Sequence, residues 1–190
     1  MNDKERFIQI CNENIKREGL DKLLQWLNKS DFFLAPASTK YHGNYEGGLV
    51  QHSLNVYDNM LKLIDILNKR ETFSMETLTI VTLFHDICKA NFYKKGYRNV
   101  KDENGAWIQK EIYEIDEKVP LGHGEKSCIL LQQFMKLNID ELLSIRWHMG
   151  GFDNATKGGD YSMAKAQEYS HLVTLLQCAD TLATIMEDKI

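Results

Sequence analysis

The residues of this chain that could do chemistry are histidines and carboxylates, and two of them are adjacent. His85 and Asp86 stand together in LFHDICK, at the end of an apolar run with helical spacing. Neighbouring residues of a helix point about 100° apart, so both side chains could reach a metal ion beyond the helix end. The pair can therefore supply a nitrogen ligand and a carboxylate that bridges two metals. A solvent-exposed His-Asp pair is the other interpretation of this dipeptide.

Four further residues give this pair its weight. His52 follows GGLVQ, His123 lies in PLGHGEKS and His148 ends the segment IRWH. Asp180 lies within the apolar segment LLQCADTLAT, where burying an unpaired carboxylate would be costly. Each of the four alone would pass for an ordinary core or surface residue, but together in one small domain they indicate a shared site.

Helical periodicity predicts the elements that must position these residues. The apolar residues are spaced as in helices over 3–28 with a break at Gly19, about 50–68, 75–88, 125–137, 138–148 and about 162–187. Over residues 96–115, apolar and polar residues instead alternate on either side of Asn104-Gly105. This dipeptide is a strong signal for the turn of a β-hairpin. We therefore expect an all-α fold, a helical bundle with one small inserted hairpin at about 96–115.

The composition is that of one ordinary globular domain. The 190 residues are 43% hydrophobic and 26% charged, with two prolines and a net charge of −4, which argues against a disordered chain and against binding of long nucleic acid. Four widely spaced cysteines and the absence of a signal peptide or a long apolar run predict a reduced, cytoplasmic protein without a membrane span. The sequence carries no signal of oligomeric state.

The ordered set H…HD…H…H…D resembles the HD-domain superfamily of metal-dependent phosphohydrolases. GGLVQHSLNV, PLGHGEKS and IRWHMGG further resemble the HD domains of exoribonuclease-related proteins and of phage or prophage hydrolases. The resemblance extends from about Tyr41 to Asp188. It implies a single HD domain over 1–190, with an N-terminal helical extension (1–40), an HD core (about 41–188) and a metal centre between the helices.

The resemblance also implies a division of the ligands between two metals. The first metal would be held by His52, His85, Asp86 and Asp180. The second would be held by His123 and His148, with Asp86 bridging the two. Imidazole and carboxylate ligands suit divalent Mn, Fe, Co, Ni or Zn.

This centre implies hydrolysis of a phosphate ester or phosphodiester in a small phosphorylated or nucleotide-like substrate, with a hydroxide between the metals as the attacking group. Asp86 and Lys89 would be catalytic. Asp86 would bridge the two metals, and Lys89, three residues later, could bind a phosphate oxygen. A lysine at a helix C-terminus is also favoured by the helix dipole alone. The expected contacts with substrate come from His42, Lys89 and Arg146.

Other interpretations of the same residues remain open. Glu125 could orient His123 or simply favour a helix N-terminus. An HD fold could also carry a mixed-valent di-iron oxygenase, a 3'-5' nuclease or phosphodiesterase acting on short oligonucleotides, or a nucleotide-binding module without turnover. His171 is not expected to be a ligand, because nine helical residues separate it from Asp180 and place it half a turn out of phase.

Overall fold

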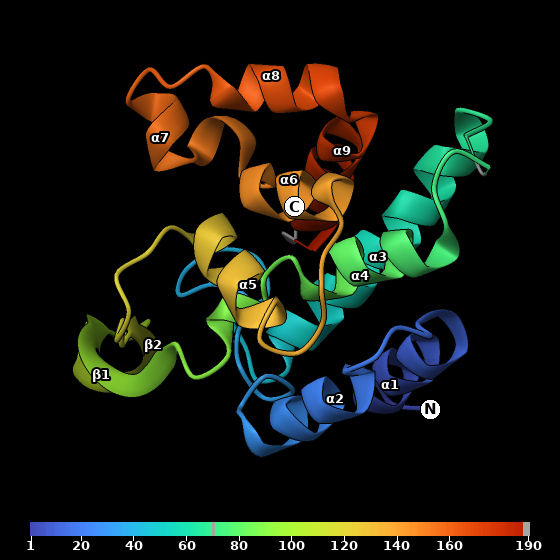
Figure 1. Cartoon of the computed structure of the whole chain (residues 1–190). Coiled ribbons are helices and arrows are strands. Elements are labelled where there is room, and N and C mark those ends of the chain that lie inside the picture. The colour runs from blue at the N-terminus through green and yellow to red at the C-terminus, as the bar shows by residue number, and fades with distance from the viewer. Residues whose placement is uncertain (70, 188–190) are drawn as a thin grey trace.

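The structure, a computed structural model, describes residues 1–69 and 71–187. These residues form a helical body from which one two-stranded ribbon projects (Figure 1). The expected all-α fold with an inserted hairpin is confirmed. In chain order the elements are α1 (Asp3–Asn14), α2 (Leu20–Lys29), α3 (Gly48–Ile66), α4 (Met75–Phe84), η1 (Ile87–Lys89), β1 (Tyr93–Lys101), β2 (Trp107–Ile115), α5 (His123–Leu131), α6 (Ile139–Trp147), η2 (Gly150–Phe152), α7 (Asn154–Lys157), α8 (Ser162–Tyr169) and α9 (His171–Glu187).

Local sequence explains the two helix boundaries that were anticipated. Gly19 separates α1 from α2 with a φ of +97°, and a Cβ there would overlap the carbonyl oxygen of Phe134, so glycine is required for both reasons. Asn138 caps α6 by accepting from the backbone N–H of Glu141, whose carboxylate accepts from the Asn138 N–H in return. This capping box fixes the start of the helix that leads to His148.

Three expected helices end or break earlier than periodicity predicts. The helix expected at about 125–137 is α5, which ends at Leu131. The helix expected over 75–88 ends at Phe84, and the chain continues through Asp86 (φ −105°, ψ 19°) into the 3₁₀ turn η1. The helix expected over 162–187 is two helices, because Ser170 is extended (φ −139°, ψ 119°) and divides α8 from α9. His171 and Asp180 nevertheless lie in one helix, so the expected half-turn between them still applies.

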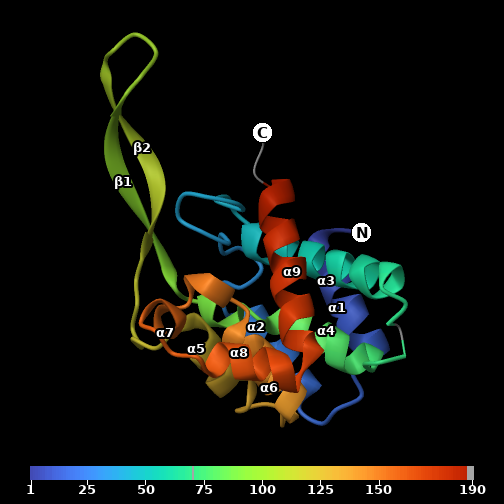
Figure 2. The same cartoon turned by 90° about the horizontal axis from the view of Figure 1, so that it is seen from above.

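The hairpin is longer than predicted at its first strand. β1 pairs antiparallel with β2 from Tyr93↔Ile115 to Lys101↔Trp107, so β1 begins three residues before the expected position 96. The start of β1 was not predicted, because the consecutive lysines 94 and 95 interrupt the alternation of apolar and polar residues. The turn lies where it was expected, with Gly105 at a φ of +79° and the Asp102 carboxylate accepting from two backbone N–H groups of the loop. Figure 2 shows the ribbon extending away from the helices.

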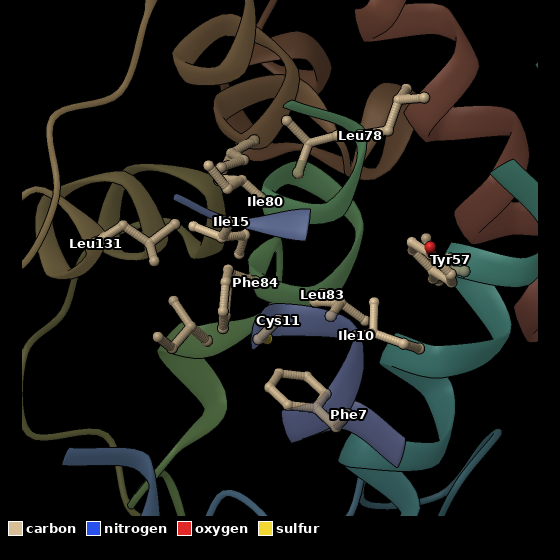
Figure 3. Packing of buried hydrophobic residues seen from close by; sticks show 14 of the residues in the cluster. Phe7, Ile10, Cys11, Ile15, Tyr57, Leu78, Ile80, Leu83, Phe84 and Leu131 are labelled. Atoms are coloured by element: carbon tan, nitrogen blue, oxygen red, sulfur yellow. The ribbon is translucent and has the colours of Figure 1, made fainter. Parts of the chain in front are cut away.

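One apolar core connects the first helix to the last. Phe7 of α1 lies against Phe32, Phe33 and Phe84, and the same buried cluster reaches Ala183 of α9. Figure 3 shows Phe7 and Phe84 among the packed side chains of this cluster. The residues expected to form an N-terminal extension therefore share the core of the helices that carry the histidines. The division at residue 40 remains a prediction. Among the described residues, no helix is long and apolar enough to span a bilayer.

A buried ion pair joins the N-terminal segment to α4 and α6. Arg17, between α1 and α2, donates from both terminal nitrogens to the carboxylate of Glu141, at 2.6 and 2.9 Å. The Glu141 side chain is fully buried and also accepts from the hydroxyl of Thr77 in the first turn of α4. The starts of α4 and α6, the helices that lead to His85 and His148, are thus held together by one carboxylate.

Replacing Arg17 with alanine should lower the free energy of unfolding by about 3 kcal/mol, because the buried Glu141 carboxylate loses its counter-ion. Urea denaturation of the purified variant measures this. Arg6→Ala is the matched control, since Arg6 pairs with Asp58 at 2.6 Å but both side chains are about one-third exposed, and it should lose less than about 1 kcal/mol. Equal losses in the two variants would contradict the role given to the buried pair.

Candidate metal centre

His85 and His148 are built into the structure in the same way. Each caps the C-terminus of a helix, α4 or α6, and its Nδ1 lies against the carbonyl oxygen three residues earlier, Thr82 at 2.8 Å and Ile145 at 2.7 Å. A carbonyl only accepts, so Nδ1 carries the proton and the lone pair of Nε2 points outward, as a metal ligand requires. The two ring centroids lie 5.0 Å apart.

The carboxylate of Asp86 lies between the histidines. Its Oδ1 is 3.4 Å from Nε2 of His148, whereas its Oδ2 is 3.5 Å from Nε2 of His85 and 4.0 Å from Nε2 of His52. The side chain is only 4% exposed. The two oxygens therefore face different histidines, which is the arrangement a carboxylate needs to bridge two cations.

His52 and Asp180 complete one side of the site. His52 comes from the beginning of α3 and Asp180 from α9, and their Nε2 and Oδ1 atoms lie 3.1 Å apart. Among the described residues, two sets of three ligand atoms lie within 4.8 Å of one another: His52, His85 and Asp180, and His85, Asp86 and His148. Five of the six expected ligands are thus brought together by the fold.

The polar atoms of this cluster fit a divalent cation. Nε2 of His85, Nε2 of His148 and Oδ1 of Asp86 are buried without a hydrogen-bond partner among the described residues. Leaving a buried donor or acceptor unsatisfied costs about 1–3 kcal/mol per group. A cation coordinated by these atoms would remove that penalty, and nitrogen with carboxylate oxygen is a donor set that transition metals accept.

The site keeps its carboxylates ionised despite burial. Burial alone would raise the pKa of Asp86, but the Lys89 ammonium, 2.7 Å from Oδ2, outweighs it and holds that pKa well below its usual range. Burial acts on Asp180 in the same sense, and the hydrogen bond from His52 with the nearby histidines lowers its pKa to about 2. Both carboxylates are therefore charged at neutral pH, as ligands of a cation must be.

Lys89 lies on the same side of the chain as Asp86, as expected, although it does so through the 3₁₀ turn η1. Its Nζ is 2.7 Å from Oδ2 of Asp86 and donates to the carbonyl oxygen of Ala37 at 2.8 Å. Burial would lower the pKa of Lys89, but the Asp86 carboxylate raises it overall. The ammonium is therefore charged and borders the cluster directly.

His123 is outside both sets of converging atoms. Its Nδ1 lies 3.5 Å from Sγ of Cys88, and its ring meets Phe92 edge to face with centroids 5.6 Å apart. Burial lowers the pKa of His123, which favours the neutral ring that a metal requires. The contact with Cys88 was not anticipated, and only its position two residues after Asp86 could have suggested it. The expected role of His123 as a ligand remains a prediction.

The other expected site residues occupy different surroundings. The ring of His42 lies 4.9 Å from that of His52, next to the cluster. Arg146 is held by two carboxylates, those of Glu125 at 2.6 Å and Asp153 at 2.9 Å. His171 is exposed and lies in neither set of converging atoms. Contacts of His42, Lys89 and Arg146 with substrate remain predictions.

Comparison with known proteins agrees with this geometry. Residues 49–185 match the family described as HD domain, a range that includes the histidines and aspartates of the cluster. The chain belongs to the HD domain family. This membership confirms the resemblance drawn from the H…HD…H…H…D pattern.

One curated relative of this HD domain is a dihydroneopterin 2',3'-cyclic phosphate phosphodiesterase from Methanocaldococcus jannaschii. It is 31% identical over 86 residues, which are 43% of this chain and 31% of the relative. The matched part therefore spans about a third of the relative's length. No solved structure matches the chain.

With the two metals that the sequence predicts, replacing Asp86 with alanine should abolish binding of both, whereas His148→Ala should mainly weaken the second, because the two oxygens of Asp86 face His85 and His148 separately. Metal content per chain after loading with Mn²⁺ and desalting measures this, with circular dichroism to verify folding. His171→Ala, an exposed histidine on the same helix as Asp180, is the control and should bind as the wild type does. Wild-type metal content in Asp86→Ala would refute the bridging role.

Proposed function

We propose that this HD domain is a dinuclear metal-dependent phosphohydrolase that cleaves a phosphate ester or phosphodiester of a small, nucleotide-like substrate. The observation that carries this proposal is the buried Asp86 carboxylate, whose two oxygens face His85 and His148 separately. Two divalent cations would supply a water of lowered pKa as the attacking group and would neutralise charge on the phosphoryl oxygens.

Each side of Asp86 is assigned its own set of ligands. His52, His85 and Asp180 converge with one another on the side of Oδ2 of Asp86, and His148 lies on the side of its Oδ1. His123 is proposed to complete the second set, since it enters at the start of α5 beside Cys88 of η1. Mn, Fe, Co, Ni and Zn all suit these ligands.

Lys89 is proposed to hold the substrate phosphate. An ammonium group has three N–H donors, and in Lys89 two of them have acceptors among the described residues, Asp86 and the Ala37 carbonyl. The third can donate to a phosphate oxygen at the cluster. His42, whose ring lies beside that of His52, is proposed to contact the substrate from the loop that precedes α3.

The relative supports a phosphodiester as the first substrate class to test. The relative is a cyclic phosphate phosphodiesterase, and family membership supports metal-dependent hydrolysis.

The purified protein, loaded in turn with Mn²⁺, Co²⁺, Ni²⁺ or Fe²⁺, should hydrolyse at least one member of a panel of phosphomonoesters, nucleoside cyclic phosphates and short oligonucleotides. Phosphate release and chromatography of the products measure this. Absence of hydrolysis with every metal would refute the proposal. Substrate-dependent oxygen consumption by the iron form would instead indicate an oxygenase, and a nucleotide recovered intact would indicate a binding module.

Lys89→Met should lower kcat on the active substrate by about 100-fold, because the phosphate loses a charged donor. Metal content is measured in parallel, since Lys89 also pairs with Asp86, and kcat is compared at full metal loading. Lys89→Arg retains the charge and should recover part of the rate. Unchanged kcat in Lys89→Met would exclude the phosphate-holding role without affecting the assignment of the metal ligands.

A further inference from the structure

The first turn of α5 lies directly on the last turn of α6. At Gly124 a Cβ would overlap the carbonyl oxygen of Arg146, so only glycine permits the approach of the two backbones. Gly124 follows His123, and Arg146 precedes His148 by two residues. The contact therefore sets how the two histidines proposed for the second metal lie relative to each other.

The side chain of Arg146 holds the same junction together. One terminal nitrogen lies 2.6 Å from Glu125 in the first turn of α5, and the other donates at 2.9 Å to Asp153, which caps α7. The guanidinium also stacks on the ring of Trp147 at 3.8 Å. Both ends of its planar fork are used, and only 16% of the side chain is exposed.

The carboxylates around Arg146 depend on it. The Asp153 side chain is 7% exposed, and Oε2 of Glu125 is buried without a hydrogen-bond partner among the described residues. That carboxylate lies against Gly122, where a Cβ would overlap it, so Glu125 folds back over the entry to His123. Removing the guanidinium would leave the buried Asp153 carboxylate and the buried Oε2 of Glu125 without the positive charge that now lies between them.

We propose that Arg146 is a positioning residue for the second metal: it fixes His123 of α5 relative to His148 of α6 by bridging Glu125 and Asp153. This rests on the proposed two-metal function. On this proposal Arg146 orients metal ligands instead of contacting the substrate, because both ends of its fork already bind carboxylates. Mutation of a residue that orients metal ligands typically lowers metal affinity by about 10- to 100-fold.

This is tested by titrating the metal-free protein with Co²⁺. Binding is measured by calorimetry and by the absorption bands of bound Co²⁺. Arg146→Lys keeps the positive charge but cannot bridge two carboxylates with a planar fork. In this variant the second equivalent of Co²⁺ should bind about 10- to 100-fold more weakly, with the first equivalent unchanged. Glu125→Gln, which breaks the same junction from α5, should show the same selective loss.

Arg6→Lys is the matched control, because Arg6 forms an arginine-aspartate pair of 2.6 Å with Asp58 in which neither residue belongs to the cluster. It should bind both equivalents as the wild type does. Melting temperatures of the metal-free variants separate positioning from general stability. Wild-type affinity for the second equivalent in Arg146→Lys, or equal weakening of both equivalents, would overturn the proposal while leaving the dinuclear function intact. A wild-type protein that binds only one equivalent would overturn both.

Discussion

The buried charge of Asp86 is the constraint on which the rest of the structure depends. A carboxylate that is 4% exposed is tolerated only when positive charge offsets the hydration that it loses. Lys89 supplies the charge from η1, and the imidazoles of His52, His85 and His148 come from α3, α4 and α6. No single element can satisfy this group, so the fold must bring several helix ends to one point.

The pairing of α4 with α6 shows how this is achieved. The two helices have nearly equal lengths, ten and nine residues, and rise about 1.5 Å per residue. The Glu141 carboxylate joins their first turns through Thr77, and His85 and His148 cap their last turns with rings 5.0 Å apart. Because the helices are aligned at one end by the buried ion pair, their histidines meet at the other. A defect at Arg17 would therefore reach the metal site through the alignment of the helices.

Local signals predicted the features that local interactions determine. Three such predictions are confirmed: the break at Gly19, the capping box at Asn138 and the turn at Asn104-Gly105. Each of them depends on a few neighbouring residues. The separation of α8 from α9 at Ser170 and the early end of α4 were missed, because periodicity continues across them. Spacing identified a histidine and aspartate set, but not the surroundings of its members. From the sequence, Arg146 was expected to contact the substrate. Only the fold shows that its guanidinium forms ion pairs with Glu125 and Asp153.

The central claim is that Asp86 bridges two metals. A crystal structure of the metal-loaded protein, with anomalous scattering recorded at the edge of the added metal, tests it most directly. We expect two ions about 4 Å apart, one on each oxygen of Asp86, with His52, His85 and Asp180 on the first and His123 and His148 on the second. A single ion, or two ions that Asp86 does not bridge, would contradict it.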